Sequence, residues 1–503
     1  FGRCRDDWGN WFGGRNLQPI WHCALDDQYL RRNPFLVPPD PCIDLMDPPT
    51  SAPVYPISSS LPRFNEFWTL NRFTAACGIA VYRDDLFGPD FIDNVFICEP
   101  TYNLVHRSVL CRRGTTFSAR RAQDEQRSEF LASTDHWFRP VQVRTGPDGA
   151  LWVVDMYRLV IEHPDFIPTR WHQELDFQAG RGRGRIYRVL PSGSQARDLA
   201  TLSGLSTTEL VRALDHPNGP RRDAVQQTIV LGQKRSAIAP LRKLVLSGAQ
   251  PKARLSALCT LDGLAAIDAA LLVRVLDDSH PALRRHGVRL AEKRVNESTE
   301  IQTTLARLVD DPDALVRIQL AYSLGAWDDR RAAEALAEIA LRDAEDPLMI
   351  AAVLSSATGF PQEILGRVLG DRTPSDAQVA LIENLLRLVL EAEQNDALAL
   401  GLRRIAAAGE GGYQQWQYTC LASLLDAIEY RGQSLKQFQD SAPTPLQQAI
   451  AATRGLLQQA QTDATDTSQS TPRRVQAMRL IGRAPAAQQI NPKYLSEMLV
   501  PQT

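Results

Sequence analysis

RPVQVRTGPDGALWVVD, residues 139–155, is the stretch that decides the fold of the first part of the chain. Two runs that favour β-strands, Pro140–Arg144 and Leu151–Asp155, flank a Pro-Asp-Gly turn at Gly146–Gly149. Such a turn between two strand-like runs indicates a hairpin, because proline fixes its own φ and glycine accepts a positive φ. Gly184–Val189 follows after an insertion and supplies a third strand. The stretch therefore predicts a short antiparallel meander.

Two earlier segments follow the same plan. One has strand-like runs at Phe73–Tyr82, Asn94–Cys98, Asn103–Leu110 and Thr115–Ala119, and the earliest has them at Phe1–Arg5, Trp11–Gly13 and Pro19–Leu25. Short meanders repeated at roughly 45 to 70 residues are typical of β-propeller blades. Because a ring needs about four to eight blades, we expect residues 1–192 to be about three C-terminal blades of a longer propeller.

The chain changes character near Ser194, where Ala, Leu and Arg become frequent with helical spacing. A polar break followed by a helix carrying an arginine recurs about every 30 to 33 residues, as in helical repeats. Its members are Asp215–Pro217 before Arg221, Ser247–Gly248 before Arg254, Asp277–Pro281 before Arg284, Asp310–Pro312 before Arg317, and a degenerate copy at Asp346–Pro347. A helix pair cannot bury its apolar face alone, so we expect residues 196–503 to form an all-α, HEAT-like solenoid.

Composition excludes several classes of protein. The formal net charge of −2 gives no basic field for nucleic acid, which argues against a nucleic-acid partner. No apolar run approaches the roughly 18 residues of a membrane span. Lysine first occurs at Lys234, so a lysine base or Schiff base cannot come from the first part. Arg31–Pro62 is rich in proline and predicts an extended surface segment.

Cysteine is concentrated in the first 111 residues, which hold six of the eight. No CxxC or CxxCH occurs, so no haem attachment motif is present. Either an oxidising compartment or buried free thiols would account for the cluster. In an oxidising compartment Cys77 and Cys98 are the expected disulfide, because they fall on adjacent strands of one blade.

Several strings in the first part are more specific than generic blades. With the PDGALWVVDMYR run at 147–158, they resemble the large planctomycete and verrucomicrobial proteins called membrane-bound dehydrogenase or haem-binding proteins. The strings are DDWGNWF (6–12), YLRRNP (29–34), CEP (98–100), NLVHR (103–107), FLASTD (130–135), WFRPV (137–141) and IEHP (161–164). The resemblance covers residues 1 to about 192.

The resemblance implies an exported protein in which a propeller similar to those of quinone-dependent sugar dehydrogenases is followed by HEAT-like repeats. A c-type cytochrome domain often completes that plan. We therefore expect a fragment of a periplasmic or extracellular oxidoreductase, truncated at both ends. It would oxidise a sugar or alcohol and transfer electrons to a cytochrome c module outside this chain. Pyrroloquinoline quinone with calcium is the implied cofactor, although activity inferred from fold analogy needs support from a site.

Arginines are the expected cofactor ligands. Arg72 and Arg139 each precede a first strand by the same distance and so should lie near one mouth of the propeller channel. Their guanidinium forks match the carboxylates of a quinone or an acidic sugar, whereas a structural ion pair is the alternative. Arg107 and Arg158, in the strings that carry the resemblance, complete the predicted set.

The insertion 159–183 interrupts the last blade and carries His163, the expected base for hydride abstraction from an alcohol. Asp155 or Asp135 would orient it, although a locally bonded His-Pro turn is the simpler interpretation. Asp124, Glu125 and Glu129 lack the spacing of a calcium loop, so no metal ligands are predicted. The competing hypothesis for the whole chain is a non-enzymatic protein whose propeller and solenoid are binding platforms for polysaccharide or protein.

Overall fold

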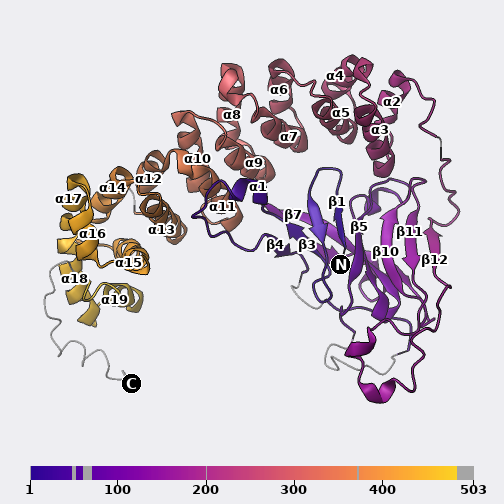
Figure 1. The fold of residues 1–503 in the computed structure, drawn as a ribbon, viewed down its shortest axis with the longest axis horizontal. Helices are drawn as coiled ribbons and strands as arrows, with labels where there is room; N and C mark the ends of the chain where they lie inside the picture. Colours follow the sequence, from indigo (N-terminus) through magenta and orange to yellow (C-terminus); the bar gives the residue numbers. More distant parts are fainter. Residues whose placement is uncertain (1, 48–51, 60–70, 200, 371–372, 484–503) are drawn as a thin grey trace. The chain divides into compact units, whose positions relative to one another are not determined.

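A computed structural model describes residues 2–47, 52–59, 71–199, 201–370 and 373–483 (Figure 1). The chain forms two compact units. Unit 1 contains Phe1–Asp26, Asp40–Ala291 and Pro312–Val316, and unit 2 contains Asp27–Pro39, Glu292–Asp311 and Arg317–Thr503. The change from strands to helices lies between Val189 and Thr207. The boundary between the units therefore differs from the boundary between strands and helices, because the first helices belong to the same unit as the strands.

Three antiparallel sheets make up the first part of unit 1. Each is a meander in chain order, which confirms the three predicted groups of strands; the described residues show no closed propeller. The sheets are β1 (Arg3–Arg5), β2 (Trp11–Gly13), β3 (Trp21–Cys23) and β4 (Cys42–Asp44); β5 (Cys77–Val81), β6 (Val95–Glu99), β7 (Leu104–Arg113) and β8 (Thr116–Arg121), with β9 (Leu131–Ala132) paired to β7; and β10 (Pro140–Thr145), β11 (Leu151–Asp155) and β12 (Arg185–Val189). The sequence patterns did not predict β4 or β9.

The second and third sheets share one core. Val143, Leu151 and Val153 from the third sheet pack with Tyr82 and Phe96 from the second, and all five are buried. Along β11 the alternate positions, Trp152 and Val154, are only half-buried. The period of two thus buries one face of the third sheet and leaves the other accessible.

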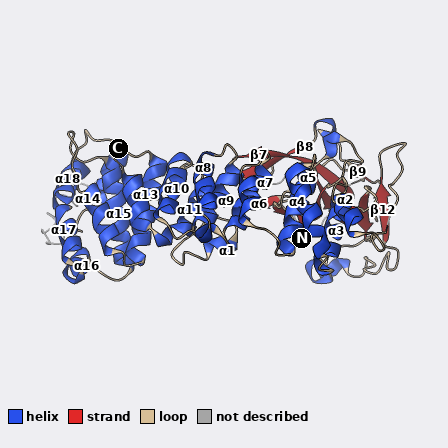
Figure 2. Ribbon diagram, turned by 90° about the horizontal axis from the view of Figure 1, so that it is seen from above, coloured by secondary structure: helices blue, strands red, loops and turns tan. Residues whose placement is uncertain are grey.

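Helices form the rest of both units. Figure 2 shows the later helices following one another side by side, as a repeat array requires. Those of unit 1 are α2 (Thr207–Ala213), α3 (Gly219–Leu231), α4 (Ile238–Ser247), α5 (Pro251–Gly263), α6 (Ala269–Leu276) and α7 (Pro281–Ala291). Unit 2 has α1 (Asp27–Leu30), α8 (Thr299–Arg307), most of α9 (Ala314–Leu324), α10 (Arg330–Arg342), α11 (Pro347–Ser356), α12 (Pro361–Leu369), α13 (Asp376–Glu391), α14 (Asn395–Ile405), α15 (Gln415–Tyr430), α16 (Leu435–Ser441), α17 (Thr444–Ala452), α18 (Arg454–Thr465) and α19 (Thr471–Met478). None of the helices in the described ranges is long and apolar enough to cross a membrane.

The recurring arginines of the repeats bind the loops that precede their own helices. Arg222, Arg284 and Arg317 each donate from Nη1 to the carbonyl oxygen six residues earlier, at distances of 2.7, 2.8 and 2.7 Å. These bonds satisfy backbone carbonyl groups of the loop that leads into the helix, which explains why an arginine recurs at this place. In the first copy the role belongs to Arg222, not to the Arg221 that the pattern selected, because Arg222, like Arg284 and Arg317, is the fourth residue of its helix.

Asp27–Pro39 is a segment of unit 2 although it lies between strands of unit 1 in sequence. Tyr29 stacks on Tyr322 with ring centroids 4.6 Å apart and donates from its hydroxyl to Glu292. Asn33 is buried and donates from Nδ2 to the carbonyl oxygen of Leu354 at 2.9 Å. The first residues of the proline-rich stretch are thus anchored by specific bonds. Residues 48–51 and 60–62 of that stretch lie outside the described residues.

Cys77 and Cys98 are register partners on β5 and β6, as expected, but both are free thiols in the structure. The disulfide expected for an oxidising compartment is therefore not present in this structure, which has the pair as free thiols. A register shift follows Cys77 along β5, and its Sγ is directed to the carbonyl oxygen of Pro140 at 3.9 Å. The geometry around Cys77 thus differs from that of a regular strand pair.

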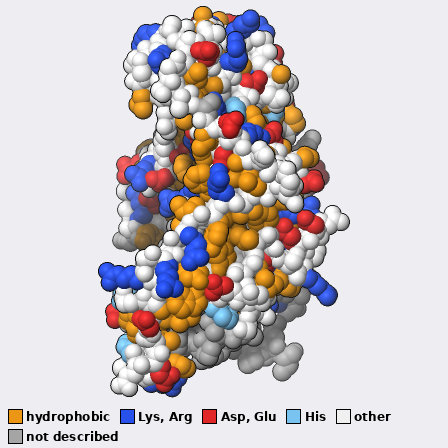
Figure 3. All heavy atoms as spheres, turned by 90° about the vertical axis from the view of Figure 1, so that its right-hand side faces the viewer, with side chains coloured by type: hydrophobic (Ala, Val, Ile, Leu, Met, Phe, Trp, Pro, Cys, Tyr) orange, Lys and Arg blue, Asp and Glu red, His pale blue; other side chains and the backbone are white. Residues whose placement is uncertain are grey.

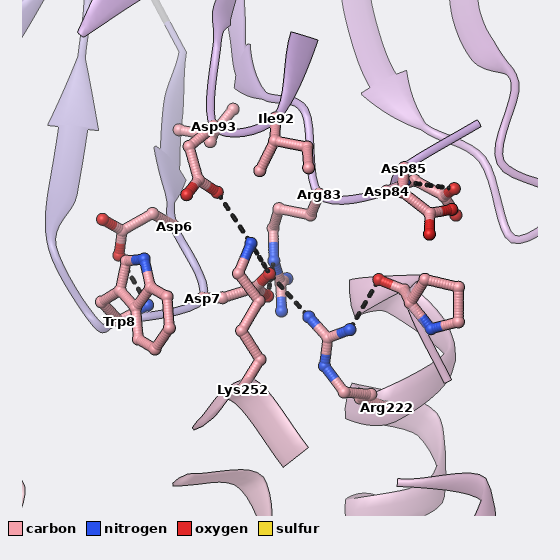
Figure 4. Close-up of polar contacts among 12 residues, drawn as sticks. Asp6, Asp7, Trp8, Arg83, Asp84, Asp85, Ile92, Asp93, Arg222 and Lys252 are labelled. Atoms are coloured by element: carbon pink, nitrogen blue, oxygen red, sulfur yellow. Dashed lines mark hydrogen bonds and ion pairs between the residues drawn. The ribbon is translucent and has the colours of Figure 1, made fainter. Parts of the chain in front are cut away.

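Asp7, in the turn between β1 and β2, is the charged centre of unit 1 (Figure 4). Its carboxylate lies 2.6 Å from Arg83 Nε, 2.6 Å from Arg222 Nη2 and 3.2 Å from Lys252 Nζ. Arg83 also binds both oxygens of Asp223, and Lys252 also binds Asp93 at 3.1 Å. Burial opposes ionisation of Asp7, but the three cations prevail and lower its pKa to about 2.

The residue after Asp7 extends this contact to α7. The indole of Trp8 stacks on the His280 ring with centroids 4.6 Å apart, and its carbonyl oxygen accepts from Arg285 and from His286 Nε2. Together with the bonds of Asp7 to α3 and α5, these contacts attach three helices to one tight turn.

We expect Asp7→Asn to destabilise unit 1 by about 3 to 5 kcal/mol, because it leaves the buried Arg222 and the half-buried Arg83 and Lys252 without their shared counter-charge. The depressed pKa means that the charge of Asp7 contributes stability above its ordinary value of 3.8 and that this contribution is lost as pH falls through about 2. Urea unfolding followed by tryptophan fluorescence at neutral pH measures the change. Asp440→Asn, in the exposed pair with Lys436, is the matched control and should cost below about 1 kcal/mol. Equal effects of the two substitutions would contradict the assignment.

Candidate functional site

An open pocket of about 390 Å³ lies against the accessible face of the third sheet. Val141, Val154, Met156 and Ile186 form its apolar wall, and Asp155, Arg158 and Arg185 supply its charged groups. Figure 3, which views the molecule from the side of β12, shows hydrophobic side chains gathered over this region. An apolar wall with a few charged groups is typical of small-molecule sites.

One carboxylate oxygen of Asp155, at the end of β11, accepts hydrogen bonds from the backbone. Its side chain is fully buried, and Oδ1 accepts from the backbone N–H groups of Arg139 and Tyr157, both at 2.8 Å. Tyr157 adopts a φ of 50°, which is rare for a residue other than glycine. Asp155 Oδ1 therefore stabilises a strained turn beside the pocket.

The second oxygen of Asp155 has no such partner. Oδ2 is buried and accepts no hydrogen bond from the described residues. Arg185 Nε lies 3.9 Å away, beyond hydrogen-bond distance. A buried acceptor left unpaired costs about 1 to 3 kcal/mol. This oxygen is therefore the group on the pocket wall that gains most from a ligand hydroxyl.

Glycines supply part of the pocket lining. Gly180, Gly182 and Gly184 all line it. Gly180 has a φ of +89°, and a Cβ there would lie 2.1 Å from the carbonyl oxygen of Tyr157. Only glycine fits that close approach. Gly180–Gly184 alternates glycine with arginine, which is the sequence signal for these positions. Because no helix follows, the alternation does not indicate a phosphate loop and did not predict the pocket.

The two arginines at the pocket approach it from different segments. Arg158 donates from Nη1 to the carbonyl oxygen of Gln178 at 3.0 Å, which uses one of its donors. Arg185 places its guanidinium over the Tyr157 ring, 3.6 Å from the centroid. Arg185 and Tyr157 were not among the predicted site residues. Both guanidiniums retain donors for a carboxylate or hydroxyl of a ligand.

Arg139 is held inside the protein close to the pocket. It is buried, and its guanidinium donates to the carbonyl oxygens of Arg158, Leu159, Pro100 and Thr101 at 2.9, 2.8, 2.7 and 3.3 Å. Burial lowers its pKa to about 10, so it stays a cation at neutral pH. Because these acceptors are all backbone carbonyls, Arg139 shapes the loop that carries Arg158.

The other predicted cofactor ligands are not brought to the pocket. Arg107 is buried between Phe91 and two carboxylates, those of Asp124 and Glu125. Arg72 is exposed and pairs through its backbone with Pro53 in an isolated β-bridge. The pocket and Arg107 thus belong to separate environments. Of the four predicted arginines, Arg158 alone lines the pocket.

His163 and Asp135 also lie away from Asp155 Oδ2. The side chain of His163 is two-thirds exposed, and Nδ1 accepts from the backbone N–H of Asp165. Asp135 is exposed, and its Oδ1 accepts from the backbone N–H of Trp137 at 2.9 Å. Both therefore cap local turns, as the simpler interpretation of the His-Pro dipeptide predicts. Neither lines the pocket.

The acidic residues weighed for calcium bind basic side chains. Glu129 is buried, with Oε2 2.8 Å from His106 Nδ1 and Oε1 3.0 Å from Arg121. Burial lowers the pKa of His106, which favours the neutral ring. Across the described ranges, no group of three or more His, Cys, Asp or Glu residues is arranged to hold a metal ion.

Comparisons with known proteins agree with the division into a sheet-rich and a helical part. Residues 1–193 match a family described as a domain of unknown function, DUF7133. Residues 267–357 match the family of HEAT repeats. No curated protein matches the chain. The C-terminal region is thus helical and HEAT-like, in agreement with the prediction from the recurring arginines.

We expect Asp155→Ala and Asp155→Asn to differ in stability. Alanine removes the acceptor of two buried N–H groups and should destabilise the protein by about 2 to 4 kcal/mol. Asparagine retains an oxygen at the Oδ1 position and should change stability by less than about 1 kcal/mol. Urea unfolding of the two variants beside the wild type measures this. If asparagine is as costly as alanine, the charge of Asp155 rather than its Oδ1 contacts stabilises the turn.

Proposed function

We propose that this protein is a binding module that holds a hydroxyl-rich ligand, a sugar or a polysaccharide, in the pocket beside Asp155. The buried Asp155 Oδ2, which accepts no hydrogen bond from the described residues, is the observation that carries the proposal. A carboxylate oxygen accepts strong hydrogen bonds from hydroxyl groups, and a hydrogen bond to such a charged acceptor contributes about 1.5 to 3 kcal/mol. The apolar wall would contact the C–H face of a sugar ring.

The charges around the pocket refine the choice of ligand. Arg158 and Arg185 offer donors to ring hydroxyls, and they would also pair with the carboxylate of an acidic sugar. Nothing in this arrangement requires a reaction, because binding is complete when Oδ2 and the guanidiniums are paired. The HEAT-like repeats would serve as a second platform, since repeat arrays bind partners through extended surfaces.

An oxidoreductase remains the second candidate. The first part resembles exported planctomycete and verrucomicrobial proteins named as dehydrogenases, so a periplasmic or extracellular location and a cytochrome c partner belong to this alternative. Asp155 Oδ2 would then take the hydroxyl proton of the alcohol or sugar. A carboxylate-rich quinone would have to rely on Arg158 and Arg185, because the donors of Arg107 and Arg139 already bind protein acceptors.

Isothermal titration with neutral and uronic-acid oligosaccharides tests the binding proposal. We expect Asp155→Asn to weaken binding of neutral oligosaccharides by about tenfold to a hundredfold, the range that loss of one charged hydrogen bond gives. Arg158→Ala should weaken acidic oligosaccharides more than neutral ones. His163→Ala, an exposed change on the insertion 159–183 but outside the pocket, is the matched control and should leave both affinities unchanged.

Two outcomes would count against this proposal. Equal affinity in the wild type and Asp155→Asn would remove Oδ2 from the site. Reduction of an artificial electron-acceptor dye by the wild type with pyrroloquinoline quinone, calcium and a sugar, abolished in Asp155→Asn, would favour the oxidoreductase. Without quinone binding, the oxidoreductase loses its cofactor.

A further inference from the structure

Cys23 and Cys42 face each other across two adjacent strands of the first sheet. Their backbones are direct register partners on β3 and β4. Cys23 is exposed and Cys42 is half-buried, so reagents in solution can reach the pair. Neither cysteine belongs to the site beside Asp155.

Backbone bonds on both sides of the pair define its type. Ala24 donates to the carbonyl oxygen of Pro41 at 2.9 Å, and Leu45 donates to that of Ile20 at 3.2 Å. In an antiparallel ladder, hydrogen-bonded and non-hydrogen-bonded pairs alternate. Cys23 and Cys42 are therefore a non-hydrogen-bonded pair.

That type of pair brings side chains close together. The Cα atoms of such pairs lie about 4.5 Å apart, within the range of about 4.4 to 6.8 Å that a disulfide spans. The electrostatics agrees with this closeness: burial raises the pKa of the Cys23 thiol, and the neighbouring Cys42 is the next contributor. In the structure both are thiols, with Cys23 Sγ directed to the carbonyl oxygen of Leu25 at 3.6 Å.

We propose that Cys23 and Cys42 form a reversible cross-strand disulfide between β3 and β4. A small disulfide such as oxidised glutathione is a sufficient oxidant. The deprotonated, exposed Cys23 attacks one sulfur of glutathione disulfide, which releases one glutathione thiolate and leaves a mixed disulfide. The thiolate of Cys42 then attacks Cys23 Sγ and releases the second glutathione. The protein loses two electrons and two protons, and both glutathione thiolates leave protonated.

The disulfide would close the loop that contains Asp27–Pro39. That segment holds Tyr29 against Tyr322 and Asn33 against Leu354 in unit 2, while its two ends continue into β3 and β4. β4 is an edge strand of only three residues, Cys42–Asp44. A covalent bond between the two ends would restrict the open conformations of this loop and so favour the anchored segment.

The other register pair, Cys77 and Cys98, provides an internal comparison. Cys98 is fully buried, and burial raises the pKa of the Cys77 thiol to about 12. Few thiolates form there at neutral pH, and solvent has little access. The two pairs should therefore differ in how quickly they exchange with a dissolved disulfide.

Oxidation of the folded protein by glutathione disulfide tests the proposal. The protein is first reduced, then incubated at pH 8, quenched with acid and alkylated under denaturing conditions for peptide mapping. We expect the wild type to lose two of its eight thiols, to yield a linked peptide that contains Cys23 and Cys42, and to recover both thiols with dithiothreitol. Cys77→Ser should give the same linked peptide, because that cysteine belongs to the other pair.

Cys42→Ser distinguishes a disulfide between the two cysteines from oxidation of the exposed Cys23 alone. This variant keeps the exposed Cys23, so we expect it to accumulate the glutathione mixed disulfide that the wild type resolves. Three results would overturn the proposal: a wild type that stops at the mixed disulfide, a linked peptide of other cysteines in place of Cys23 and Cys42, or no loss of thiols at any glutathione ratio.

Discussion

One buried carboxylate organises the larger part of unit 1. Asp7 meets Arg83 from the strand region and Arg222 and Lys252 from two helices, and each cation except Arg222 also has a second carboxylate partner. Buried charges are tolerated only when they are matched in this way, so the turn and the helices depend on one another. This dependence explains why the first helical repeats form a compact unit with the sheets rather than with the later repeats.

The hydrogen-bond partners of the two Asp155 oxygens likewise separate a structural role from a functional one. Oδ1 of Asp155 accepts hydrogen bonds from two backbone N–H groups, and these bonds are its structural role. Its Oδ2 is equally buried and unpaired, at the wall of a pocket with two guanidiniums. Proteins pair nearly all their buried polar atoms, so a buried carboxylate oxygen without a hydrogen bond at a pocket wall indicates where a ligand would gain most. The argument for a binding site rests on that atom rather than on the fold.

Much of the fold follows from local patterns. The hairpin at Gly146–Gly149 and the recurring arginines before the repeat helices are short-range signals, and strands and helices occur where these signals predict them. The strand β4 and the anchoring of Asn33 were not predicted, because each depends on a partner far away in sequence. In the candidate site, Asp155 was predicted as a partner of His163 and Arg158 as a cofactor ligand, and both line the pocket. Arg185 was missed because its role comes from the turn at Tyr157.

The arginines show why residue type alone is a weak guide to a ligand site here. Before Lys234 arginine is the only strong cation of the chain, so it must serve every structural need for a positive charge or a multiple donor. The Arg139 guanidinium donates hydrogen bonds to four backbone carbonyl oxygens, and Arg107 lies between two acidic side chains. A bond to a backbone carbonyl oxygen requires no particular residue type as its acceptor, so it leaves no signal in the sequence. A structural arginine and a ligand-binding arginine therefore look alike until their acceptors are known. What distinguishes Arg158 and Arg185 is that they line a pocket whose own carboxylate oxygen accepts no hydrogen bond from the described residues.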